Sequence, residues 1–63
     1  MTPEDFLFWR SSLGLKQRDA AERLGLSPNT VRKYERGEVP IPLYVALACA
    51  AVSFNLPPWR NAA

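Results

Sequence analysis

The three residues Gly-Leu-Ser at positions 25–27 separate two segments that each have the pattern of a short helix. The first segment, residues 17–24, is followed by the glycine of this connector, and a glycine at that place favours the left-handed conformation that ends a helix. The second segment, residues 28–36, follows the serine, begins with a proline and stops at Gly37, which are typical start and stop signals. So short a connector predicts two neighbouring helices that cross steeply.

A further helix is expected before this pair, at about residues 3–13. The residues Thr-Pro-Glu-Asp at positions 2–5 provide a hydroxyl cap, a proline at the first helical position and an acid that resembles half of a capping box. Apolar side chains then recur at helical spacing, and the pattern predicts that three of them are buried: Phe6, Trp9 and Leu13.

A fourth helix is expected at about residues 43–54, after a loop that contains two prolines. This segment is apolar on nearly every side and carries no charge, so it must be covered all round. In so small a domain the other helices can cover only one side, and the second side therefore predicts a subunit contact. The tail, residues 55–63, is expected to be extended by Pro57 and Pro58, with Trp59 either folding back or crossing to a partner.

Taken together, these segments predict one all-α domain over residues 1–63, a small four-helix fold with an extended C-terminal tail. A chain of 63 residues has a small core that needs support. With one cysteine and no histidine, an intramolecular disulfide and an ordinary zinc site are both excluded. Cys49 is expected to pack in the core. No apolar stretch is long enough for a bilayer, so we expect a cytoplasmic protein with no membrane contact.

Self-association is the support that remains, and we expect a homodimer. Its interface is assigned to apolar side chains that lie off the buried stripe of the first helix, on the fourth helix and in the tail: Leu7, Phe8, Tyr44, Leu47, Ala48, Ala51, Val52, Leu56 and Trp59.

The middle of the chain is its basic part, although the net charge is only +2. Six bases and three acids lie between residues 16 and 36. An anionic partner is one interpretation of this cluster. The alternative is that these charges form only the solvated face of short helices.

Residues 15–37, LKQRDAAERLGLSPNTVRKYERG, resemble the phage Cro/repressor or Xre-type helix-turn-helix family. The shared features are a glutamine that opens the second helix, an alanine in its middle, the Leu-Gly-Leu-Ser turn, a valine four residues later and a Glu-x-Gly end. The resemblance extends back to Trp9 and forward to about Phe54. The chain departs from five-helix members at residues 56–59, which stand where a further helix would be.

The resemblance implies double-stranded DNA as the partner. An α-helix fits the major groove, and residues near the N-terminus of the second helix of the pair reach the base edges. Val31 and Tyr34 face inward on that helix. Steps of three and four place the remaining side chains on one outward face, and these are the expected base contacts: Pro28, Asn29, Arg32 and Lys33. Asparagine suits adenine, and arginine or lysine suits guanine.

By the same resemblance, Gln17 and Thr30 are expected to touch phosphates, and charge is expected from three further residues: Lys16, Arg18 and Arg36. Lys16 stands where the family usually has a serine or threonine cap. It either faces a phosphate, or another group caps the helix and Lys16 lies in water. The resemblance also implies a buried ion pair between Arg10 and Glu35.

The expected function is a dimeric repressor, or autorepressor, of a small phage, prophage or plasmid operon, acting on an inverted-repeat operator without a small-molecule ligand, cofactor or metal. The alternative is a protein-interaction module, such as an antitoxin, in which the helix-turn-helix is vestigial. An enzyme is rejected because the sequence has no histidine, no paired carboxylates on one face and no glycine-rich phosphate loop.

Overall fold

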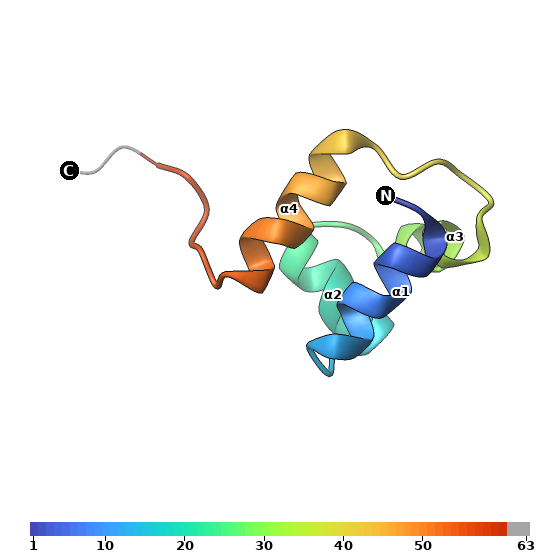
Figure 1. Ribbon diagram of the computed structural model, residues 1–63, viewed down its shortest axis with the longest axis horizontal. Helices are drawn as coiled ribbons and strands as arrows, with labels where there is room; N and C mark the ends of the chain where they lie inside the picture. Colours follow the sequence, from blue (N-terminus) through green and yellow to red (C-terminus); the bar gives the residue numbers. More distant parts are fainter. Residues whose placement is uncertain (61–63) are drawn as a thin grey trace.

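The computed structural model describes residues 1–60 of the chain, and its regular structure is entirely helical (Figure 1). The four helices are α1 (Pro3–Ser12), α2 (Gln17–Leu24), α3 (Pro28–Arg36) and α4 (Leu43–Ser53). The all-α, four-helix architecture predicted from the sequence is therefore confirmed. The first and fourth helices end one residue earlier than expected. Residues 61–63 of the expected tail lie outside the described part of the chain.

The starts of α1 and α3 follow the predicted capping chemistry. The Thr2 hydroxyl accepts a hydrogen bond from the Asp5 backbone N–H at 3.0 Å, and the Asp5 carboxylate accepts one from the Thr2 N–H at 2.9 Å. These reciprocal bonds form a complete capping box. At α3, the Ser27 hydroxyl accepts a hydrogen bond from the Thr30 N–H at 3.2 Å. The bonds at α1 satisfy backbone donors at the start of the helix, whereas the Thr30 N–H also donates to the Ser27 carbonyl at 3.1 Å.

The start of α2 has only half of this arrangement. Lys16 is the N-cap residue, and its side chain makes no capping bond because an ammonium group has no acceptor. The Asp19 carboxylate accepts a hydrogen bond from the Lys16 backbone N–H at 3.2 Å. The side chain of Lys16 is therefore free of any role in the cap.

The turn between α2 and α3 depends on a glycine. Gly25 ends α2 with φ 71° and ψ 30°, a left-handed conformation that residues with a Cβ rarely adopt. Leu26 then donates its N–H to the Ala21 carbonyl at 2.8 Å and packs partly against the core. The chain thereby turns within three residues and begins α3 at Pro28.

The core lies where all four helices meet, and each helix contributes two buried side chains: Phe6, Trp9, Ala20, Ala21, Val31, Tyr34, Val45 and Cys49. The Phe6 ring lies at its centre, 5.4 Å from the Trp9 ring and 5.9 Å from the Tyr34 ring between centroids. Small alanines on α2 allow neighbouring helices to approach closely. α3 packs against both α1 and α2, so the body of the molecule fixes its orientation.

The predicted burial of Leu13 was wrong, because this side chain is 40% exposed. The spacing from Phe6 to Trp9 to Leu13 requires a continuous helix, but α1 ends at Ser12. Leu13 is the C-cap residue, with φ −93° and ψ 0°, and Gly14 follows it in a left-handed conformation. The chain turns away before Leu13 can join the buried stripe.

A side-chain hydrogen bond joins the first and last helices. The Trp9 indole Nε1 donates to the Cys49 carbonyl oxygen at 2.9 Å, across 40 residues of sequence. The Ser53 hydroxyl donates to the same oxygen at 3.0 Å. A buried indole N–H needs such a partner, so this bond fixes the position of α4 against α1.

Residues 55–60, which follow α4, lead away from the body of the molecule (Figure 1). Trp59 is 87% exposed, so of the two possibilities left open by the sequence, folding back onto its own domain is not observed. None of the helices in residues 1–60 is both long and apolar enough to cross a bilayer.

Replacing Trp9 with phenylalanine should lower the free energy of unfolding by about 1–3 kcal/mol, since the ring still fills much of the space but the bond to the Cys49 carbonyl is lost. Urea denaturation measures the change. Trp59→Phe is the matched control and should have an effect below about 0.5 kcal/mol at concentrations where the chain is monomeric. Equal effects of the two substitutions would contradict the assigned role of Trp9.

Burial raises the pKa of the Cys49 thiol to about 11. The thiolate is the reactive species, so the native thiol should react with a maleimide or disulfide reagent at pH 8 at least about a hundredfold more slowly than the urea-unfolded chain. Because the folded pKa is raised, the native state also keeps its proton while the unfolded thiol ionises, and stability should fall as the pH rises toward 11. Equal labelling rates in the native and unfolded chains would contradict the burial.

Candidate nucleic-acid interface

The outward face of α3 carries four exposed side chains: Pro28, Asn29, Arg32 and Lys33. Val31 and Tyr34, on the opposite face, are buried in the core. This division follows from the helical repeat, which places residues three and four apart on one side. α3 therefore presents a polar and basic surface at its N-terminal half while its other side is held by α1 and α2.

Two of these exposed side chains are bonded to each other. The Arg32 Nη2 donates a hydrogen bond at 2.9 Å to the Oδ1 of Asn29, which lies three residues earlier on the same helix. The bond places the Asn29 amide and the Arg32 guanidinium side by side. The Asn29 amide hydrogens and the other guanidinium hydrogens are not used in this bond and remain available as donors on exposed side chains. This pair is a platform that is rich in donors, and the contact between the two side chains was not predicted from the sequence.

A partly buried ion pair fixes α3 from behind. The Arg10 guanidinium forks onto the Glu35 carboxylate through Nε and Nη2, with an Nη2 to Oε1 distance of 2.9 Å. The side chains are only 17% and 10% exposed. Arg10 also donates from Nη1 to the Leu15 carbonyl at 2.9 Å. The pair that the resemblance implied therefore ties α1, the following loop and α3 together.

Gln17 joins the same network. Its amide Nε2 donates to the Glu35 Oε1 at 3.1 Å, so one carboxylate receives donors from both α1 and α2. Gln17 is half-buried. One of its two amide hydrogens remains for a phosphate, and the other holds the start of α2 against α3.

The other candidate phosphate contacts lie around the ends of α2 and α3. Lys16 and Arg18 are exposed at the start of α2. The Thr30 hydroxyl is half-buried and lies 2.9 Å from the Ser27 hydroxyl. Arg36 is exposed at the end of α3, and its Nη1 lies 3.6 Å from the Glu38 Oε2. An ion pair so exposed contributes little and leaves Arg36 available for other anions.

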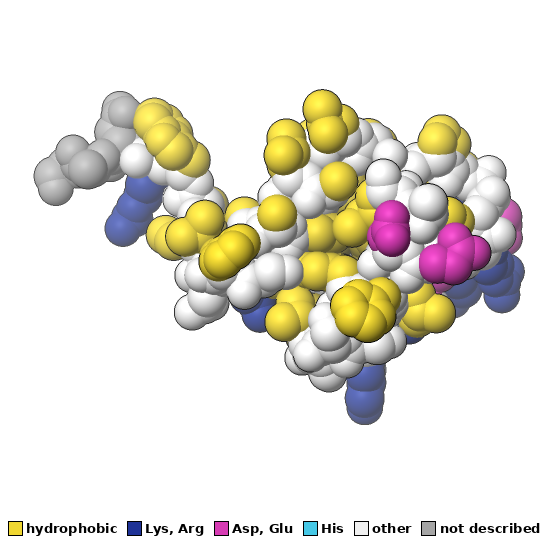
Figure 2. Space-filling view, viewed as in Figure 1, with side chains coloured by type: hydrophobic (Ala, Val, Ile, Leu, Met, Phe, Trp, Pro, Cys, Tyr) yellow, Lys and Arg dark blue, Asp and Glu magenta, His cyan; other side chains and the backbone are white. Residues whose placement is uncertain are grey.

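Exposed apolar side chains gather on other surfaces of the molecule, over α4, the tail and α1 (Figure 2). Of the candidate interface residues, those on α1 and in the tail are exposed, and so are Tyr44 and Leu47. Ala48, Ala51 and Val52 are half-buried. The structure adds Leu43 and Phe54, which are 75% and 78% exposed. Sequence reasoning missed both, because every position around α4 is apolar and periodicity gives no contrast there.

Substitution of Glu35 with glutamine should lower the free energy of unfolding by about 3–5 kcal/mol, because the partly buried Arg10 guanidinium would lose its counter-charge. Thermal or urea denaturation measures this loss. Glu38→Gln removes the same charge from an exposed pair and should cost less than about 1 kcal/mol. Similar losses in the two variants would show that the Arg10–Glu35 pair has no special structural role.

Comparison with known proteins places this geometry in a family. The model of the family described as Helix-turn-helix matches residues 9–52, which run from Trp9 in the core almost to the end of α4. The comparisons with curated proteins and with solved structures gave no significant match. The match covers more than half of the chain, including the whole α2–α3 pair and its three-residue turn. The chain therefore belongs to the Cro/repressor, Xre-type helix-turn-helix family, which is non-enzymatic and binds DNA.

Proposed function

We propose that this protein is a sequence-specific transcriptional repressor that binds an inverted-repeat operator as a homodimer, with α3 in the major groove. The observation that carries the proposal is the exposed N-terminal half of α3. Asn29, Arg32 and Lys33 point away from the core there, and none of them forms an ion pair with an acid in residues 1–60. A helix that presents such donors from a fixed orientation suits the major groove.

Base reading is assigned to Pro28, Asn29, Arg32 and Lys33. Arginine and lysine donate to the two acceptors of guanine, O6 and N7. A bidentate contact of asparagine with adenine needs the Oδ1 atom as an acceptor, and in the free protein this atom already accepts from Arg32. The platform formed by Asn29 and Arg32 therefore favours acceptor-rich edges, and we expect guanine opposite it in the operator.

Phosphate contacts are assigned to Lys16, Gln17, Arg18, Thr30 and Arg36. Lys16 makes no capping bond with its side chain, and this supports the proposal that it contributes charge toward the backbone. Such contacts fix the position of the protein on the duplex but do not read its sequence.

The homodimer is proposed because the exposed apolar side chains of α4, α1 and the tail exceed what the monomer can cover. Two copies related by a two-fold axis would present their α3 helices to half-sites about 34 Å apart, one turn of the duplex. By analogy with the family, we assign the protein to a small phage, prophage or plasmid operon, with its own promoter as a target.

The alternative is a protein-interaction module, such as an antitoxin, that uses the exposed apolar side chains of α4. This alternative gives no role to an outward, basic α3 face. Operator binding and partner binding separate the two functions because they depend on different residues, those of the α3 face and those of α4.

Selection from random duplexes should yield a preferred inverted repeat, and the double substitution Arg32→Ala and Lys33→Ala should abolish preference for it in a gel shift. Each good base contact contributes about 1–3 kcal/mol of discrimination. Circular dichroism should show an unchanged helical content, because both side chains are exposed.

Arg18→Gln is the matched control, since it removes one charge at a proposed phosphate contact. This variant should bind all duplexes more weakly and to a similar degree. The slope of the logarithm of the binding constant against the logarithm of the salt concentration should become smaller by about one, because about one counterion fewer is released. Failure of the wild-type chain to select any sequence at moderate salt would contradict the proposed function.

A further inference from the structure

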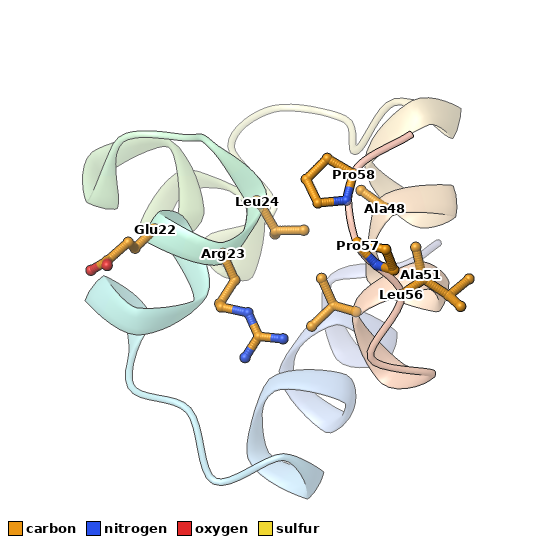
Figure 3. A pocket seen from close by; sticks show the side chains of 9 residues that line it. Glu22, Arg23, Leu24, Ala48, Ala51, Leu56, Pro57 and Pro58 are labelled. Carbon is orange, nitrogen blue, oxygen red and sulfur yellow. The ribbon is translucent and has the colours of Figure 1, made fainter. Parts of the chain in front are cut away.

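An apolar hollow opens between α2, α4 and the tail (Figure 3). Its volume is about 460 Å³. Leu24 points into it from α2, Ala48 and Ala51 form the wall on α4, and residues 56–58 form a further wall. Sites that hold ligands of drug size have roughly 300–1,000 Å³, so this hollow is large enough for an aromatic side chain. The two alanines leave the space, because larger side chains there would fill it.

The residue that follows the hollow along the chain is Trp59, whose side chain is 87% exposed. Pro57 and Pro58 line the hollow themselves, and proline restricts the backbone to extended conformations. The backbone therefore leads away from the hollow after Pro58 (Figure 1), and Trp59 follows with its side chain exposed. A large aromatic side chain in water and an unfilled apolar hollow thus lie next to each other in one molecule.

We propose that this hollow receives Trp59 of a second copy of the chain, so that two copies exchange their C-terminal arms, each arm being residues 55–60. The proposal rests on the homodimer of the proposed function and names the contact that would hold it together. A two-fold axis makes the exchange reciprocal, since each copy contributes one arm and one hollow.

A charge at the hollow suits this arm. Arg23 lines the hollow and offers a guanidinium group to the face of an indole. Glu22 also borders the hollow, but its carboxylate points away from it, on the other side of α2 from Leu24 (Figure 3).

The arms would form part of a larger contact. A buried tryptophan contributes roughly 150–250 Å², whereas a stable interface buries roughly 800 Å² on each partner. The α4 wall of the hollow continues into the exposed side chains of Tyr44 and Leu47, which lie four residues before Ala48 and Ala51, respectively, on the same side of the helix. The hollow and this part of α4 therefore form one continuous apolar surface.

Sedimentation equilibrium measures the dimer dissociation constant of Trp59→Ala. We expect at least about tenfold weaker association, because a tryptophan in a pocket at an interface is a typical dominant contact. Trp59→Phe should weaken dimerisation less than Trp59→Ala does, because the phenyl ring still fills part of the hollow. The side chain is exposed in the monomer, so both variants should fold, and circular dichroism checks this. An unchanged dissociation constant, or a wild-type chain that stays monomeric at all concentrations, would overturn the proposal.

A mixture of two variants distinguishes a partner's arm from the chain's own arm. Trp59→Ala removes the side chain that would enter the hollow, and Ala51→Leu fills the hollow that would receive it. Each variant alone should associate more weakly than the wild type. In the mixed dimer, Trp59 of the Ala51→Leu chain meets the open hollow of the Trp59→Ala chain, so one of the two contacts is native. The mixture should associate at least about fivefold more tightly than either variant alone. No gain on mixing would overturn arm exchange.

A gel shift with the selected duplex separates this proposal from the proposed function. If the wild-type chain recognises the duplex but Trp59→Ala dimerises as tightly as the wild type, only the arm exchange is overturned. A wild-type chain without sequence preference overturns the proposed function.

Discussion

The ion pair between Arg10 and Glu35 is the interaction on which the rest of the structure depends. One carboxylate on α3 receives donors from Arg10 on α1 and from Gln17 at the start of α2. The same guanidinium holds the loop between these helices through the Leu15 carbonyl. Because the pair is shielded from water, its loss would leave a charge without a partner and not merely one contact fewer. The network therefore fixes the angle at which α3 leaves the body of the molecule, and that angle decides whether its exposed residues can enter a groove together.

The surface of the molecule is divided between two tasks. α3 turns its apolar side chains inward and keeps polar and basic ones outside, whereas α4 is apolar all round and only Val45 and Cys49 are fully covered. A chain of this size buries a smaller share of its surface than a larger domain does, so the uncovered side of α4 and the tail is the natural place for association. In the proposed homodimer, assembly through α4 would leave α3 free, and the dimer could bind two half-sites at once.

The sequence predicted most of the fold because local signals marked the ends of the helices. Thr2, Ser27, Gly25 and Gly37 each occupy the capping position that their chemistry favours. Leu13 was placed wrongly, because its spacing fits a helical stripe but α1 ends one residue before it. The exposed side of α4 could not be located in full, since an unbroken apolar sequence has no polar face to orient it. The bond between Asn29 and Arg32 and the hollow beside the tail arise from positions in space, which residue types alone do not specify.

A titration of ¹⁵N-labelled protein with the selected duplex, followed by NMR, tests most directly that the N-terminal half of α3 is the surface that meets DNA. The largest changes in chemical shift are expected at the backbone amides of residues 27–33 and at the Asn29 side-chain amide, with smaller changes at the start of α2. Changes concentrated on α4 and the tail, with α3 unaffected at saturation, would contradict this expectation.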